Sequence, residues 1–192
     1  GGILGPESMR LARDWFATPF VGSFIVVAAY ALLAMAVQSR VHVPKPTREE
    51  RSGGGRPLGE IMRQPVFIVA VISAAFGYGI MNLLMVATPL AMDFCSHPFA
   101  QAAMVIQWHV VGMYAPGLFT GSLIRRYGTL KVILAGVALV GGCVAVALSG
   151  TTVTHFLVAL ALLGVGWNFM YTGGTTLLTE SYAPAEKART QG

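Results

Sequence analysis

Long stretches without charged side chains alternate with short polar segments along this chain. Asp, Glu, Lys and Arg are absent from residues 15–39, 64–92, 94–124 and 132–179. A helix in water keeps one polar face, so uncharged stretches of this length are typical of segments that lie in lipid. As a helix, residues 15–39 would extend over ~37 Å and cross a hydrocarbon layer of ~30 Å with some tilt.

Turn signals divide these stretches into five membrane-spanning helices. The 48 residues of 132–179 are too many for one crossing, and a turn is expected at Ser149 to Thr152. Pro116 removes one backbone hydrogen bond and predicts a kink in the third helix. We expect spans at 15–39, 64–92, 99–122, 130–148 and 154–177, with parts of two further helices at 1–6 and 178–192.

Composition and charge agree with this reading. Of the 192 residues, 55% are hydrophobic and 11% are charged, whereas about a quarter of a soluble domain is charged. The net charge of +5 reflects topology, because 11 of the 13 Lys and Arg lie in residues 40–63, 125–131 and 187–189. Alternating crossings place these three segments on one side, which the positive-inside tendency makes cytoplasmic. We therefore expect a multi-pass protein of the cell membrane (plasma or inner) and no nucleic acid as a partner.

Polar side chains are concentrated in three of the five spans. A polar group in hydrocarbon costs on the order of a few kcal/mol unless it is paired or hydrated, so this sorting indicates a shared polar interior. Residues 17–38 and 130–148 carry mainly aliphatic and small side chains and are interpreted as lipid-facing supports. The candidates for a solute cavity are Tyr78, Asn82, Met85, Gln107, Trp167, Asn168, Tyr171 and Thr175.

These candidates follow helical spacing, which leaves two interpretations open. Trp167 and Tyr171 are four residues apart, as are Tyr78 and Asn82, so each pair shares one face of its helix. Such a stripe suits an organic solute, because rings stack and amides fix orientation. The same residues fit equally well as contacts between helices. His109, the titratable side chain near the middle of a span, suits a proton relay or, more commonly, a hydrogen-bonded packing partner.

Signatures of enzymes are missing from the sequence. It contains neither HExxH nor a P-loop, and no carboxylate pair lies at membrane depth. Cys95 and Cys143 lie in or beside apolar stretches without paired spacing, so we expect no disulfide and no metal site. The sequence predicts a protein that is not an enzyme and needs no cofactor.

A short basic turn between the third and fourth spans resembles a known signature. Its sequence is similar to the loop signature G-x-L-A-D-R-x-G-R-K of the major facilitator superfamily. Four positions match, the lysine is displaced by one residue, and an arginine takes the acidic position. These residues are Gly121, Leu123, Arg126 and Gly128 for the matches, Lys131 for the lysine and Arg125 for the departure.

The resemblance implies an all-α membrane protein, an MFS-type multi-span helical bundle of which this chain covers a part. Residues 1–39 would hold the end of the first six-helix half (helices 5 and 6), 40–63 the central cytoplasmic loop, and 64–192 helices 7 to 10 with the start of helix 11. Helices 7 and 10 of this family line the central cavity, helix 8 lies between the halves, and 6 and 9 support them.

It also implies a secondary active transporter that moves a small organic solute by alternating access. Proton-coupled efflux is the finer expectation, with a proton as coupling ion and a monomer as the full-length form. The alternative is an uptake permease for a vitamin-like or other neutral nutrient. A third reading is a membrane sensor of the same fold that transports nothing.

Overall fold

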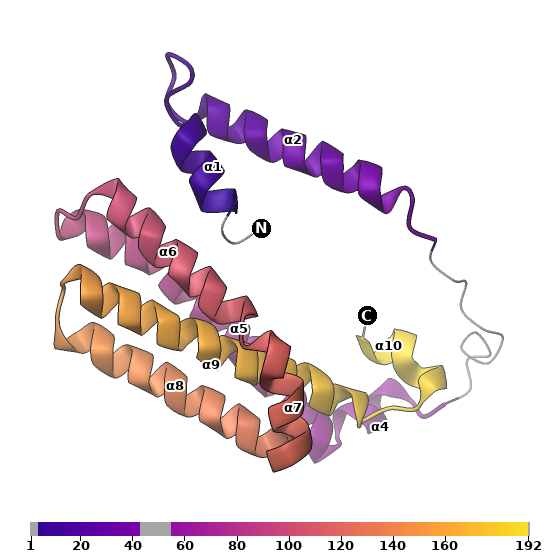
Figure 1. Ribbon diagram of the computed structural model, residues 1–192. Helices are drawn as coiled ribbons and strands as arrows, with labels where there is room; N and C mark the ends of the chain where they lie inside the picture. The colour runs from indigo at the N-terminus through magenta and orange to yellow at the C-terminus, as the bar shows by residue number, and fades with distance from the viewer. Residues whose placement is uncertain (1–3, 43–54, 192) are drawn as a thin grey trace.

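Helices account for the regular structure of the described part of the chain. The computed structural model describes residues 4–42 and 55–191, which contain no β-strand. The helices are α1 (Leu4–Ala12), α2 (Val21–Gln38), α4 (Leu58–Met62), α5 (Pro65–Phe94), α6 (Phe99–Tyr114), α7 (Gly117–Tyr127), α8 (Thr129–Ser149), α9 (Val153–Thr179), η1 (Pro184–Glu186) and α10 (Lys187–Gln191) (Figure 1).

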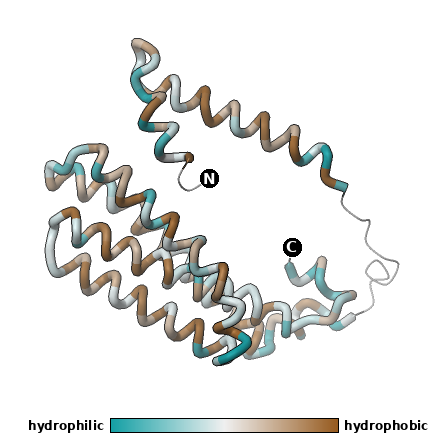
Figure 2. The backbone as a smooth tube through the Cα atoms, viewed as in Figure 1, coloured by the Kyte–Doolittle hydropathy of each residue, from teal (hydrophilic) through white to brown (hydrophobic). Residues whose placement is uncertain are grey.

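The described residues contain helices suited to four or five membrane spans, in agreement with the hydropathy pattern. Helices α2, α5, α8 and α9 are each long and apolar enough to span a bilayer, and α6 and α7 are so when taken together as one segment bent by 41°. The bend lies at Ala115 and Pro116, which confirms the predicted kink. Apolar residues cover these helices along most of their length (Figure 2). The break between α8 and α9 confirms the turn expected at Ser149 to Thr152.

The first span is shorter than predicted, and the helix before it is longer. α1 continues to Ala12 rather than ending at residue 6, and α2 begins at Val21 rather than at residue 15. The chain reverses between them: Phe20 has a positive φ of 68°, and its N–H donates to the carbonyl of Arg13 at 2.8 Å. An uncharged stretch therefore marks the lipid layer plus an apolar turn at its surface, and hydropathy alone does not separate the two.

Helix α9 lies at the centre of the bundle and packs against α5, α6 and α8. Small residues let these backbones come close. A Cβ on Gly164 would lie 2.6 Å from the carbonyl oxygen of His109, so α6 and α9 cross in contact at this point. The core around this crossing consists of Met92, Val105, Val140, Cys143, Ala159, Leu160, Leu163 and Met170.

Helices α1 and α2 form a hairpin that meets the bundle through α1. The hydroxyl of Ser23 donates to the carbonyl of Met9 at 2.9 Å and fastens α2 to α1. α1 in turn contacts α6, while α2 runs apart from the bundle in Figure 1. Most side chains of α2 are exposed, among them Leu32 and Met35.

The segments that flank the bundle on the side of α4 and α10 are tied together by a buried carboxylate. Glu186, 3% exposed, accepts from the guanidinium of Arg56 at 2.8 Å and from the backbone N–H of Ala183 at 2.8 Å. Arg56 and Gln64 both donate to the carbonyl of Ser181. Residues 43–54 of the predicted 40–63 loop lie outside the described residues, and its end from Gly55 onward packs against the segment after α9.

The Glu186 contacts predict a pH-dependent contribution to stability. The Arg56 guanidinium, helped by the backbone N–H groups of Ala183 and Arg56, lowers the pKa of Glu186 to about 2. A carboxylate with a lowered pKa stabilises the fold fully above its unfolded pKa of about 4.5 and loses that effect as the pH falls towards 2. We expect Glu186→Gln to lower the melting temperature at pH 7, with a gap to the parent protein that narrows below about pH 4.5.

Thermal unfolding of the intact protein in detergent at pH 7, 4.5 and 3 measures this gap. Glu180→Gln is the matched control, because Glu180 is exposed at the end of α9. A gap that stays constant from pH 7 to 3 would show that Glu186 acts through its shape and not through its charge.

Candidate functional site

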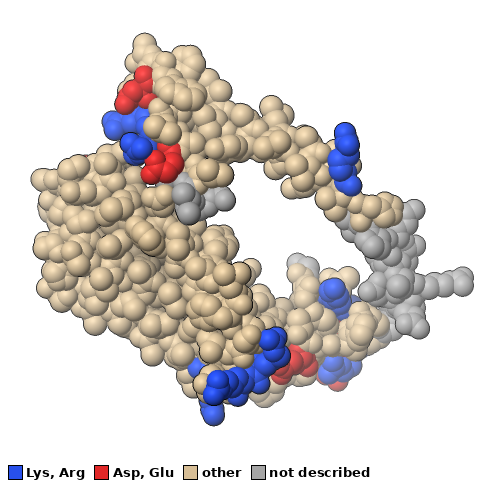
Figure 3. All heavy atoms as spheres, viewed as in Figure 1, with Lys and Arg blue, Asp and Glu red and all other residues tan. Residues whose placement is uncertain are grey.

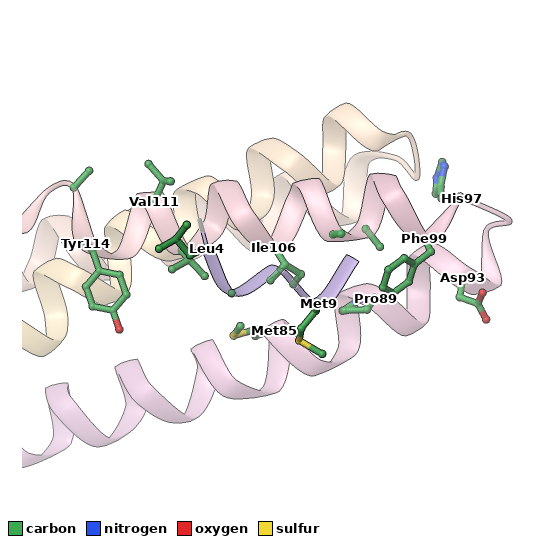
Figure 4. A pocket seen from close by; sticks show the side chains of 15 residues that line it. Leu4, Met9, Met85, Pro89, Asp93, His97, Phe99, Ile106, Val111 and Tyr114 are labelled. Carbon is green, nitrogen blue, oxygen red and sulfur yellow. The ribbon is translucent and has the colours of Figure 1, made fainter. Parts of the chain in front are cut away.

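An apolar cavity of about 1090 Å³ lies between α1, α5 and α6 (Figure 4). Aliphatic side chains from all three helices form its wall, among them Leu4, Met85 and Ile106. Figure 4 shows Asp93, His97 and Phe99 at one end of the cavity and Tyr114 at the other. The cavity thus runs along the bundle and has its polar groups near its two ends.

Four aromatic side chains gather beside the Tyr114 end of this cavity. The rings of Trp167 and Tyr171 are stacked, with centroids 5.0 Å apart and planes inclined by only 11°. Tyr114 meets Trp167 edge to face at 6.3 Å, and Tyr78 lies 6.4 Å from Tyr171. We call Tyr78, Tyr114, Trp167 and Tyr171 the aromatic cluster. It joins α5, α6 and α9, the three helices that carry the predicted polar groups.

Sulfur-containing side chains surround the buried member of the cluster. Trp167, 8% exposed, packs against Met81 and Met113, with Met85 beside them. Met85 also lines the cavity, so the methionines connect cavity and cluster. Unbranched, polarizable side chains of this kind adapt to ligands of different outline. Of the predicted cavity residues, Tyr78, Met85, Trp167 and Tyr171 are therefore brought together.

Asn168 lies next to Trp167 in sequence but serves another contact. Its Oδ1 accepts from the hydroxyl of Thr120 at 2.6 Å, and its Nδ2 donates to the carbonyl of Met113 at 2.8 Å. Both partners flank the break between α6 and α7, where Pro116 interrupts the backbone hydrogen bonds. Asn168 is buried, at 6% exposure. Its placement favours the interhelical interpretation, with the amide pairing groups at the kink.

The other predicted cavity residues are distributed more widely. Asn82 is exposed on α5, one turn after Tyr78, and makes no side-chain hydrogen bond within residues 4–42 and 55–191. Gln107 is half-buried on α6. Thr175 is exposed and its hydroxyl donates to the carbonyls of Tyr171 and Thr172 in its own helix. Asn82 is thus the predicted amide near the aromatic cluster whose polar atoms are available to a solute.

His109 is buried between α6 and α9. Its exposure is 0%, and its Nδ1 lies 2.8 Å from the carbonyl oxygen of Leu160. Its Nε2 is buried without a hydrogen-bond partner in the described part of the chain. His109 does not line the cavity. This placement is that of a packing residue, and a role in proton relay stays a prediction.

Sequence reasoning missed Tyr114. This tyrosine lines the cavity and contacts Trp167, so it belongs to both parts of the site. It follows Gln107 by seven residues, or two helical turns, and therefore lies on the same face of α6. That spacing was visible in the sequence and could have identified Tyr114.

The basic signature turn forms a tight connection between α7 and α8. Gly128 stands alone between the two helices with a φ of 88°, a conformation that favours glycine. Arg125 donates to the hydroxyl of Ser122 at 3.0 Å, and Arg126 lies over the ring of Tyr127. Leu123 is half-buried, while Gly121 and Lys131 are exposed. Figure 3 shows basic side chains gathered at this end of the molecule.

The fold and the cavity together define the class of this protein. It is a helical membrane protein in which α1, α5 and α6 surround an apolar cavity. The sequence model of the Major Facilitator Superfamily matches residues 1–192, and the chain belongs to this family. The chain is 40% identical to the riboflavin transporter RfnT of Brucella anthropi, over 99% of the chain and 48% of RfnT.

Two further relatives come from Bacillus subtilis. The uncharacterized MFS-type transporters YdeG and YddS are 30% and 28% identical to the chain, over 100% of it and 49% and 48% of their own lengths. The chain spans about half the length of the curated relatives it matches. No solved structure matches it. The family and the names of these relatives confirm the expectation of a transporter fold in a cell membrane rather than an enzyme.

Proposed function

We propose that this protein is a secondary active transporter whose solute is a planar heteroaromatic compound of the riboflavin type. The observation that carries the proposal is the parallel pair of Trp167 and Tyr171 beside a large apolar cavity. The name of the 40% identical relative, a riboflavin transporter, supports the same solute class.

The chemistry of the aromatic cluster suits a flat, uncharged ring system. Each aromatic contact adds about 0.5–1.5 kcal/mol beyond the burial of apolar area. The cluster contains no ionised side chain, and Asp93 lies at the far end of the cavity. Asn82, exposed one turn from Tyr78, supplies an amide that pairs with the ring carbonyls of such a solute. A strongly ionic solute would find no counter-charge here.

Alternating access is the proposed mechanism, with residues 1–39 and 64–192 belonging to two halves joined by residues 40–63. The positive-inside tendency supports an orientation in which residues 40–63, 125–131 and the C-terminal tail are cytoplasmic. Figure 3 shows Lys and Arg side chains gathered at the end of the bundle where α7 meets α8. Proton-coupled efflux through His109 and uptake of a vitamin-like nutrient are the two finer proposals for direction.

Binding of riboflavin to the purified intact protein tests the solute class. Stacking on an aromatic side chain quenches flavin fluorescence, so a titration yields the dissociation constant. We expect Tyr171→Leu to weaken binding about tenfold, which corresponds to about 1.4 kcal/mol. Tyr30→Leu is the matched control, because Tyr30 is exposed on α2 and lies outside the cluster. Equal affinities for the parent and for Tyr171→Leu would contradict the proposed site.

Flux in proteoliposomes then tests transport and its direction. Riboflavin loaded inside or outside is followed with and without an imposed pH gradient. Accumulation driven by the gradient supports proton coupling, and the side of accumulation separates efflux from uptake. Binding without flux in either direction would favour the sensor reading.

A further inference from the structure

A cation lies between two aromatic rings where the α1–α2 hairpin touches the bundle. The guanidinium carbon of Arg13 is 5.1 Å from the ring centre of Phe20 and 5.0 Å from that of Phe99. The two rings also meet edge to face at 6.2 Å. Phe20 belongs to the hairpin and Phe99 opens α6, so this contact joins segments that lie on opposite sides of the 40–63 loop in sequence. We call these three residues the Arg13 clamp.

The hairpin holds its part of the clamp in a strained conformation. Phe20 has a φ of 68°, which is uncommon for any residue but glycine and costs free energy for an aromatic side chain. The hairpin is closely packed beside it, because a Cβ on Gly22 would lie 2.1 Å from the carbonyl oxygen of the fully buried Ala12. Strain of this kind persists where the surroundings fix it, often at places that move or bind.

Few other interactions hold the cation of the clamp. Asp14 is the nearest carboxylate, with 3.7 Å between its Oδ1 and the Nε of Arg13, and its side chain is 79% exposed. The Nε of Arg13 is buried without a hydrogen-bond partner in the described part of the chain. The two rings are therefore the main partners of Arg13, and a single cation–π contact is a modest interaction.

The clamp lies at one end of the cavity. Phe99 lines the cavity at the end that also carries Asp93 and His97 (Figure 4). Leu4 and Met9 of α1 line the same cavity, so the hairpin forms part of its wall. Separation of Arg13 from Phe99 would move α1 away from α6 and open the cavity at that end.

We propose that Arg13, Phe20 and Phe99, which are in contact in this structure, form a gate that controls access to the cavity from the membrane face that carries the α5–α6 turn. This inference rests on the proposed transport by alternating access. The gate opens when the hairpin moves away from α6 and closes when the guanidinium returns between the two rings. The contact stabilises the closed state only modestly, so reopening the gate costs little free energy.

Cysteine labelling of the intact protein in oriented membrane vesicles tests the gate. A cysteine at Ile106, on the cavity wall, reports access in a background with Cys95→Ala and Cys143→Ala. A membrane-impermeant maleimide is applied to each face in turn. A separate protein that retains Cys95, which lies in the α5–α6 turn, identifies the face on which the gate lies.

We expect Arg13→Ala to raise the labelling rate of the Ile106→Cys reporter from the Cys95 face about 3- to 10-fold, the order by which one cation–π contact shifts an equilibrium. Phe99→Leu should act in the same direction, and it keeps the proposal testable if Arg13→Ala does not fold. Arg10→Ala is the matched control, because Arg10 lies on α1 three residues before Arg13 and pairs with Glu7 outside the clamp. Arg10→Ala should leave the rate unchanged.

Three results would overturn the gate: no rise in either folded variant, an equal rise in Arg10→Ala, or a rise only from the opposite face. Access to the cavity does not require a solute, so labelling and riboflavin binding report separately. If the parent protein does not bind riboflavin, the proposed solute is refuted and the labelling result can still be interpreted. Normal binding with unchanged labelling would refute the gate and leave the solute standing.

Discussion

Replacing Asn168 by leucine is expected to destabilise the intact protein by about 1–3 kcal/mol while leaving its affinity for riboflavin almost unchanged. The amide pairs the Thr120 hydroxyl and the Met113 carbonyl at the kink between α6 and α7. Leucine fills the space but leaves both groups without this partner in a dry interior, which is the costly outcome. Titration with SDS in mixed micelles measures the free energy of unfolding.

For Asn82, replacement by leucine is expected to have the opposite effects on stability and on riboflavin affinity. It is exposed one turn from Tyr78 and has no side-chain hydrogen bond within the described ranges, so Asn82→Leu should change stability by less than about 0.5 kcal/mol. The affinity of this variant for riboflavin should fall several-fold, because the proposed amide contact is lost. Equal destabilisation by the two leucines, or a loss of affinity confined to Asn168→Leu, would reverse the roles assigned to these residues.

Hydropathy predicted the spans because a charged side chain in lipid is costly and because each crossing has a minimum length. The kink at Pro116 and the turn after Ser149 followed from backbone chemistry that does not depend on neighbouring helices. Helix ends were harder, since the apolar turn before Val21 reads like a continuation of the span. Features set by the local sequence, such as the kink and the turn, were thus predictable. Helix ends that depend on where the membrane surface lies were less so.

The division of roles inside the site was not predictable from spacing. Trp167 and Asn168 are neighbours about 100° apart on one helix, and both lie within reach of a polar interior. The spacing of four residues allows Trp167 to stack with Tyr171 within α9, but only the packing of α9 on α6 shows that Asn168 pairs groups at the kink. The contact of Arg56 with Glu186 joins residues 130 positions apart, and no local pattern indicates it.

The crossing of α6 and α9 is the contact on which both the kink and the aromatic cluster depend. Gly164 precedes Trp167 by one helical turn, and a Cβ on it would lie 2.6 Å from the carbonyl oxygen of His109 and 2.9 Å from the backbone nitrogen of Met113. These are backbone atoms, so no side-chain rotation relieves the overlap. We expect Gly164→Ala to lower the free energy of unfolding by about 1–3 kcal/mol as the helices separate.

The same separation should weaken riboflavin binding, because Met113 and Tyr114 on α6 would move away from Trp167 on α9. Gly141→Ala is the matched control: Gly141 is exposed on α8, and a Cβ there would meet nothing within 4 Å. Alanine favours a helix over glycine, so this variant should be unchanged or more stable by up to about 1 kcal/mol. SDS titration and flavin quenching of both variants measure the two effects. If Gly164→Ala matched Gly141→Ala in both, the helices could not be in backbone contact at Gly164, and the geometry of the cluster would need another cause.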